Sequence, residues 1–236
     1  MKKLLLLHLL LAMFLGAQTS GASVVLNATN FPDDNFRAYI SNLTGVSVGS
    51  TISDAKLANV TNIDVNHRSI SSLQGIEYFT ELTKLDCSNN QLTSLDVRWN
   101  TKLIDLNCNY NQLTSLDVSK NTELTILDCS FNQLSSLDVS NNTKLKELTC
   151  NYNNIGYLYL SKNTKLESLH CSDNRIDQLN LSDNINLTGI SCKNNRLTNL
   201  KLDNNVSLLR PEFISFDNQS STRRFQRMSN GSNVND

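Results

Sequence analysis

The sequence predicts an elongated α/β solenoid of stacked coils, and a strict repeat, a strand pattern and a distinct N-terminal segment support this prediction. The chain has 236 residues, and its six cysteines follow one another at a constant spacing of 21 residues. Around each cysteine the same pattern recurs, as in LTKLDCSNNQLTSLDVRWNTK, which begins at Leu82. A fixed period in this range is the signature of a solenoid, in which each repeat forms one coil and mainly contacts its neighbours. The cysteines are Cys87, Cys108, Cys129, Cys150, Cys171 and Cys192.

The repeat itself fits a known consensus. When each copy is numbered from its first leucine, leucine or isoleucine occupies places 1, 4, 11 and 14, cysteine place 6 and asparagine place 9. This string matches the leucine-rich-repeat consensus, with cysteine where leucine is usual. Six copies run from Leu82 to Ser207, and a looser copy precedes them from Val60. We therefore expect a leucine-rich-repeat solenoid over residues 60–207.

Each copy contains one short strand and one extended return segment. Leu85 and Cys87 alternate with polar residues, which indicates a strand with one buried face. Strands of successive coils are expected to pair as a parallel sheet on the concave side. The return segment over residues 114–118 also alternates and is β-branched, so we expect a largely non-helical convex side.

The asparagines are predicted to be structural. The chain turns sharply after each strand, and buried backbone groups at a turn need hydrogen-bond partners. A side-chain amide has both donors and acceptors, so it serves the turns above and below. A second column at place 19, from Asn100 to Asn205, is expected to do the same at the opposite corner. The place-9 asparagines are Asn90, Asn111, Asn132, Asn153, Asn174 and Asn195.

The cysteines are predicted to form a ladder of buried thiols. In an exported chain, six cysteines would normally suggest disulfides. Inward side chains on adjacent parallel strands, however, stay nearly parallel and about 4.8 Å apart, whereas a disulfide needs converging Cβ atoms about 3.8 Å apart. Zinc is disfavoured because no C-x-x-C occurs and His170 lies on the strand face opposite Cys171. We expect no metal and no cofactor.

The N-terminal residues predict export. Met1-Lys2-Lys3 is followed by an apolar run over residues 4–15 and then by small residues, which is the pattern of a secretory signal peptide over residues 1–22. No second long apolar run follows, so no transmembrane segment is expected after its removal, and the chain should be secreted or held at the cell surface. Without these lysines, 19 basic residues face 22 acidic ones, which argues against a nucleic-acid partner.

The segments on either side of the repeats are expected to close the core. Residues 23–59 should form a helical cap, with one helix near FPDDNF capped by Asn30 and a second over residues 53–58. Residues 208–236 should form a degenerate C-terminal cap followed by a disordered tail, because the repeat pattern fails there and few apolar residues remain.

A family resemblance adds to this reading. The stretches FPDDNFRAYI and ISSLQGIEYFTEL, together with the cysteine-bearing copies, resemble the internalin-J-like secreted leucine-rich-repeat proteins of bacteria over about residues 27–207. The resemblance implies a helical cap on a curved solenoid that binds host or surface ligands. It transfers no individual binding residues, because ligand contacts differ between members.

The exposed side chains of the repeat predict a ligand-binding surface. Three consecutive copies carry an aromatic residue at place 8, next to Ile126 on the strand face. Aromatic rows of this kind suit protein hot spots or stacking against sugar rings, and the alternative is a self-packing ladder that stiffens the loops. His170 has no evident orienting acid, so catalysis is disfavoured. The candidate contact residues are Tyr110, Phe131, Tyr152, Ile126, Asp86, Asn107, Asp128 and His170.

These observations together predict a function. We expect a secreted or cell-surface binding module without catalytic activity, which presents its concave side to a protein ligand in adhesion or host interaction. The alternatives that the residues leave open are a glycan-binding module and a structural surface spacer without a specific ligand.

Overall fold

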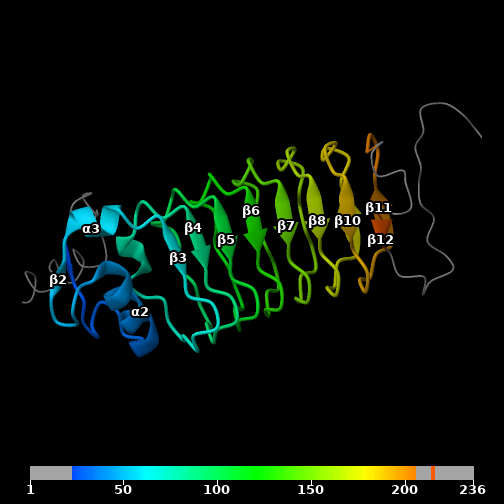
Figure 1. The fold of residues 1–236 in the computed structure, drawn as a ribbon. Coiled ribbons are helices and arrows are strands. Elements are labelled where there is room, and N and C mark those ends of the chain that lie inside the picture. Colours follow the sequence, from blue (N-terminus) through cyan, green and yellow to red (C-terminus); the bar gives the residue numbers. More distant parts are fainter. Residues whose placement is uncertain (1–22, 206–213, 216–236) are drawn as a thin grey trace, which may run out of the picture.

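The computed structural model describes residues 23–205 and the two-residue strand 214–215. The segment predicted as a signal peptide, residues 1–22, lies outside the described residues, as does most of the segment predicted as a C-terminal cap and tail. The described part is a stack of coils with two helices at one end (Figure 1).

One strand from each coil joins a single parallel sheet, here named the long sheet. Its eight strands lie in the order β12-β10-β8-β7-β6-β5-β4-β3, and neighbours pair in parallel. The pairing is in step with the repeat, since Leu85 lies opposite Leu106 and Leu106 opposite Leu127. The predicted parallel sheet is thereby confirmed. The strands are β3 (Asn62–Asp64), β4 (Lys84–Asp86), β5 (Asp105–Asn107), β6 (Ile126–Asp128), β7 (Glu147–Thr149), β8 (Ser168–His170), β10 (Gly189–Ser191) and β12 (Ile214–Ser215).

The return segments are extended, as predicted. Strands β9 (Gln178–Asn180) and β11 (Asn199–Lys201) pair in parallel, and Asp96 forms an isolated parallel bridge with Asp117. Within residues 82–205 the structure contains no helix. The outward side chains at places 13 and 15 of these segments form what we call the return face.

The core is a continuous stack of inward side chains. In each full coil the apolar residues at places 1, 4, 6, 11 and 14 are buried, as in Leu82, Leu85 and Cys87, and so are those at place 16 except Leu202, which is partly buried. They belong to one hydrophobic cluster that begins in the cap and continues to Leu200. Since each fully buried apolar side chain contributes about 1.5–3 kcal/mol and a single coil buries few of them, stability depends on stacking many coils.

The N-terminal cap consists of two short helices and a small sheet. The helices are α2 (Asp34–Thr44) and α3 (Asp54–Ala58), and β1 (Val24–Val25) pairs antiparallel with β2 (Thr51–Ile52). Helix α2 is amphipathic and buries Phe36 and Ile40.

The predicted N-cap of the first helix was wrong. Asp33, not Asn30, precedes α2, and its carboxylate accepts from the backbone N–H of Phe36 at 3.0 Å. The same carboxylate accepts from the backbone N–H of Ser71 at 2.8 Å, which ties the helix start to the first coil. Asn30 instead donates its side-chain amide to the backbone carbonyl of Val25 at 2.9 Å.

Aromatic packing joins the cap to the solenoid. The ring of Phe31 lies 6.0 Å from that of Phe36, 5.8 Å from Tyr78 in the 3-10 helix η1 (Ile76–Tyr78), and 6.5 Å from Phe79. Gly75 lies against Phe31 with φ of 104°, so a Cβ atom at this position would be 2.2 Å from Cδ1 of the ring.

The cap also covers the edge of the long sheet at β3. Tyr39 on α2 accepts a hydrogen bond at 3.1 Å from the backbone N–H of Asp64. Arg68, which stands at the asparagine place of the first coil, lies 4.9 Å from the centre of the Tyr39 ring. This arrangement satisfies an edge donor and gives Arg68 a cation–π contact.

Candidate ligand-binding surfaces

The cysteine ladder lies inside the stack. All six cysteines are buried thiols, each on the inner side of its strand end, one coil apart. Cys87 donates weakly to the backbone carbonyl of Asn107 in the next coil, with 3.4 Å between sulfur and oxygen. Burial raises the pKa of the five thiols from Cys87 to Cys171 well above the ordinary value, because a thiolate would lose its hydration there. The ladder thus serves as part of the core and is not a reactive surface.

We expect the cysteines not to react with thiol reagents in the native protein. At about pH 8, near the ordinary thiol pKa of ~8.5, a buried thiol with a raised pKa carries almost no thiolate. Titration should therefore find almost no reactive thiols in the native protein and all six after denaturation without a reductant. A disulfide-linked peptide in the mass spectrum of the unreduced protein would contradict the ladder.

The place-9 asparagines close the turns after the strands. Asn132 donates its side-chain amide to the carbonyls of Cys108, Cys129 and Ser130 at 3.0–3.1 Å, and its oxygen accepts from the N–H of Leu113 at 2.9 Å. The same four-bond pattern recurs in the neighbouring coils at Asn111. Each of these asparagines therefore bonds both its own turn and the turn of the preceding coil.

The place-19 asparagines form a second column at the opposite corner, but unlike the place-9 column they serve it through their amide donors alone, since the buried side-chain oxygens of Asn121 and Asn142 have no hydrogen-bond partner among the described residues. Asn142 is fully buried and donates to the carbonyls of Val118 and Asn121 in the preceding coil at 3.0 and 2.8 Å. Asn121 donates in the same way to Val97 and Asn100, at 2.9 Å each. The two columns lie inside the stack, so the surface available to a ligand is formed by other residues.

The aromatic column at place 8 is exposed and stacked. The ring centres of Tyr110 and Phe131 are 4.0 Å apart with planes inclined by 10°, and those of Phe131 and Tyr152 are 4.3 Å apart with planes inclined by 15°. Tyr110 and Tyr152 remain 48% and 49% exposed. The rings thus cover one another's faces and present their edges and the tyrosine hydroxyls to solvent.

Place 8 has a left-handed backbone in every coil. The φ angles of Tyr110, Phe131 and Tyr152 are 50°, 52° and 53°. Aromatic residues are unfavourable in this conformation, by roughly 1–2 kcal/mol each, whereas asparagine and aspartate tolerate it. Asn89 and Asp173, which flank the aromatic column at the same place, have the same backbone conformation.

Polar residues on the strand face beside this column form a hydrogen-bonded network. The carboxylate of Asp86 accepts from the backbone N–H of Ser88 at 3.0 Å and from the side-chain amide of Asn107 at 3.3 Å. Asp128 accepts from the side-chain amide of Asn109 at 2.8 Å. The structure therefore places Asp86, Asn107 and Asp128 together, in line across successive strands.

The two other candidate residues on this face lie farther along it. Ile126 begins β6 and is 36% exposed. His170 ends β8, is exposed, and its Nε2 lies 3.2 Å from the hydroxyl of Ser168 on the same strand. Within the described residues, the side chain that hydrogen-bonds the His170 ring is this serine hydroxyl. It is not a carboxylate that could orient the ring for catalysis.

The sequence reasoning missed a second aromatic feature, which lies on the return face. Tyr157 and Tyr159 are 60% and 77% exposed, with ring centres 6.4 Å apart and planes inclined by 8°. The first three full copies carry serine and aspartate at these places, and only the fourth carries tyrosine at both. That departure from the repeat was the available signal.

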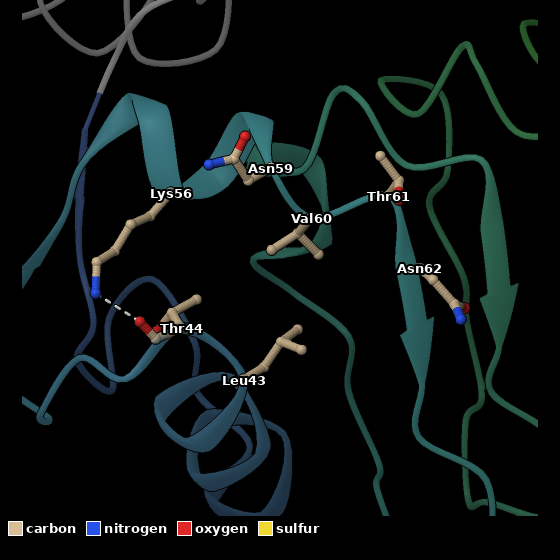
Figure 2. A pocket seen from close by; sticks show the side chains of 7 residues that line it. All are labelled: Leu43, Thr44, Lys56, Asn59, Val60, Thr61 and Asn62. Atoms are coloured by element: carbon tan, nitrogen blue, oxygen red, sulfur yellow. Dashed lines mark hydrogen bonds between the residues drawn. The ribbon is translucent and has the colours of Figure 1, made fainter.

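Two surface hollows among the described residues are relevant to ligand binding. One, of about 380 Å³, lies between α2, α3 and β3, where Lys56 donates to the carbonyl of Thr44 at 2.6 Å (Figure 2). The other, of about 220 Å³, lies on the return face, where two aspartates and a row of serines line it. Within residues 23–205, no three histidine, cysteine or acidic side chains lie close enough together to hold a metal ion. None of the helices in this range is long and apolar enough to cross a bilayer.

Coils of 21 residues, each with one short strand in a parallel sheet, a buried cysteine and a buried asparagine turn, define a leucine-rich-repeat solenoid of the internalin type. No protein-family model matches the chain. The chain is internalin-J-like: a 70-residue segment, 30% of its length, is 41% identical to internalin J of Listeria monocytogenes serotype 4b and 40% identical to that of serovar 1/2a. The segment spans 8% of either relative.

Solved structures extend the likeness to most of the chain. The functional domain of internalin J from L. monocytogenes, which includes a cysteine ladder, is 33% identical with a TM-score of 0.54, over 80% of this chain and 52% of that domain. A leucine-rich-repeat protein of Leptospira interrogans is 25% identical with a TM-score of 0.59, over 69% and 50%. Internalin C2 of L. monocytogenes, at 21% identity and a TM-score of 0.59 over 83% and 97%, shares the fold.

Proposed function

We propose that this chain is a secreted or surface-held binding module that engages a protein ligand over the long sheet and the aromatic column beside it. The pattern of residues 1–22 supports export, and the likeness to internalins supports ligand binding without catalysis. The proposed organisation is a signal peptide, a helical cap over residues 23–59, a solenoid over 60–207 and a C-terminal cap and tail over 208–236.

The observation that carries this proposal is the energetic balance of the aromatic column. Three aromatic residues in the left-handed region cost roughly 1–2 kcal/mol each. The two ring stacks return about 0.5–1.5 kcal/mol each, in addition to the apolar area that they bury. Asparagine, which stands at the same place in Asn89, would satisfy the backbone without this cost. The backbone cost thus offsets much of what the column contributes to stability, whereas an exposed aromatic row is the kind of surface that a binding hot spot uses.

The position of the column also suits a protein ligand better than a sugar at this site. Sugar rings stack on free aromatic faces, and the faces of Phe131 are covered by Tyr110 on one side and by Tyr152 on the other. Edges, tyrosine hydroxyls and the neighbouring carboxylates of Asp86 and Asp128 remain for polar and apolar protein contacts.

The test is a triple variant, Tyr110→Asn, Phe131→Asn and Tyr152→Asn. Surface proteins extracted from epithelial and bacterial cells are passed over immobilised wild-type protein and over the variant. Because hot-spot truncations cost about 2 kcal/mol or more each, a ligand captured by the wild type should bind the variant at least about 100-fold more weakly. Asparagine suits the left-handed backbone, so the melting temperature should change little.

The matched control changes the return face instead. Tyr157→Ser with Tyr159→Asp restores the residues of the earlier copies and should leave protein capture unchanged. Equal affinity of wild type and triple variant for the captured ligand, with a clearly lower melting temperature of the variant, would mean that the column is a stiffening ladder and would overturn the proposal.

A further inference from the structure

The exposed tyrosine pair on the return face has no role in the fold. Tyr157 and Tyr159 flank the buried Leu158, and both rings point outward while the leucine keeps its place in the core. Tyr159 is the most exposed large apolar side chain recorded in the described residues. Since serine and aspartate satisfy the same places in Ser136 and Asp138 one coil earlier, the coil does not require the rings.

The tyrosine pair lies beside a polar hollow. Pairing on the return face joins residues 21 apart, as in Asp96 with Asp117 and Asn180 with Lys201, and the same offset places Asp138 opposite Tyr159. The hollow of about 220 Å³ is therefore one coil away from the rings. Apart from Leu116, its lining consists of hydroxyl, carboxylate and amide side chains, namely Ser115, Asp117, Ser119, Ser136, Asp138, Ser140 and Asn141.

The carboxylates of the hollow are held in place by hydrogen bonds and can still accept more of them. Asp117 and Asp138 each accept from a backbone N–H two residues later, at 2.9 Å from Ser119 and Ser140 respectively, and each also accepts from the hydroxyl of that serine. A carboxylate has about four acceptor sites on its two oxygens, so each of these carboxylates can accept a further hydrogen bond from a ligand hydroxyl. These contacts fix the carboxylates toward the return face.

We propose that the tyrosine pair and the adjoining hollow form a carbohydrate-binding site on the return face, with an oligosaccharide lying along the solenoid axis. One sugar ring would place its apolar face on the exposed tyrosine rings, and the hydroxyls of the next would donate to Asp138 and Asp117. The contrast with the place-8 column supports the assignment. The ring centres of Tyr157 and Tyr159 are 6.4 Å apart, so these rings cover each other less than those of Tyr110 and Phe131, whose centres are 4.0 Å apart. The site is independent of the protein ligand proposed above and lies on the other side of each coil.

The experiment measures oligosaccharide binding by calorimetry and by tyrosine fluorescence. Cellohexaose, chitohexaose, laminarihexaose and mannohexaose are titrated into the whole protein. At least one should bind with a Kd of about 1 mM or tighter. The double variant Tyr157→Ser, Tyr159→Asp should weaken that binding at least tenfold, because it removes both rings. Tyr157→Phe with Tyr159→Phe keeps the rings and should retain most of the affinity.

Further measurements decide the outcome. Asp138→Asn should weaken binding severalfold, whereas the place-8 triple variant should leave it unchanged, so failure of one proposal does not affect the other. The melting temperature of the double variant should equal that of the wild type, because both rings are exposed. The carbohydrate site would be overturned if none of the four oligosaccharides bound, or if the double variant retained the binding. It would also be overturned if the protein bound hexa-arginine and no sugar, because the carboxylates would then recognise a cationic peptide.

Discussion

Replacing Gly75 with alanine is expected to lower the free energy of unfolding by about 3 kcal/mol, because two penalties act together. The backbone at Gly75 has a φ of 104°, which an L side chain adopts only with strain. The added Cβ would also lie 2.2 Å from Cδ1 of Phe31 and 2.9 Å from the carbonyl oxygen of Asn30. Phe31 is fully buried among three other rings, so it has no room to move, and overpacking of this kind costs about 1–3 kcal/mol.

The chain offers a matched control for this change. Gly49 has a φ of 90° but nothing lies within 4 Å of the position of its Cβ, so Gly49→Ala carries only the conformational penalty of about 1–2 kcal/mol. Urea unfolding of both variants measures the difference. A Phe31→Ala background removes the contact with the ring but leaves the backbone carbonyl of Asn30, so Gly75→Ala should cost clearly less there than in the wild type and still somewhat more than Gly49→Ala. If Gly75→Ala and Gly49→Ala prove equally destabilising in the wild-type background, the close packing at the cap joint is refuted.

Replacing Asn132 with alanine in the middle of the stack is also expected to cost about 3 kcal/mol of unfolding free energy. The change removes one side-chain amide that donates three hydrogen bonds and accepts one, and it leaves the N–H of Leu113 and the carbonyl of Cys108 buried without that partner. Buried groups left in this way cost about 1–3 kcal/mol each, and the turns relax only in part.

The control for this variant is a surface asparagine of the following corner. Asn141 is exposed and makes a single long contact of 3.4 Å with the carbonyl of Ser119, so Asn141→Ala should change stability by less than about 0.5 kcal/mol. Chemical denaturation of both proteins provides the comparison. Equal unfolding midpoints of Asn132→Ala and Asn141→Ala would show that the place-9 asparagines do not stabilise the turns.

The regular part of the fold could be predicted because the direction of each side chain follows from the alternation of apolar and polar residues along a strand. Leu85 and Cys87 point inward for the same reason in every copy, since successive side chains of a strand lie on opposite faces. The helix start illustrates the opposite case. Asn30 and Asp33 are both good capping residues, and Asp33 is also held by Ser71, which lies 38 residues away in the sequence and is therefore not visible in the local pattern.

The candidate surfaces were predictable in composition but not in geometry. The row of Tyr110, Phe131 and Tyr152 was evident from the period, whereas the overlap of their rings depends on the left-handed backbone at place 8. The asparagines and aspartate that share this column are the residues that tolerate such a backbone, and they were a usable signal. Tyr157 and Tyr159 were overlooked because Leu158 between them fits the consensus.

The in-step pairing of the long sheet has a consequence for how the chain folds. Its strand partners stand about one repeat apart along the chain, as Leu85 does from Leu106 and Leu106 from Leu127. Adding a coil to a folded neighbour therefore closes one loop of the same modest length each time, with nearly the same entropic barrier. No coil has enough core of its own to start the process. We therefore expect folding to begin at the aromatic joint between cap and first coil, and order to spread from there coil by coil along the chain.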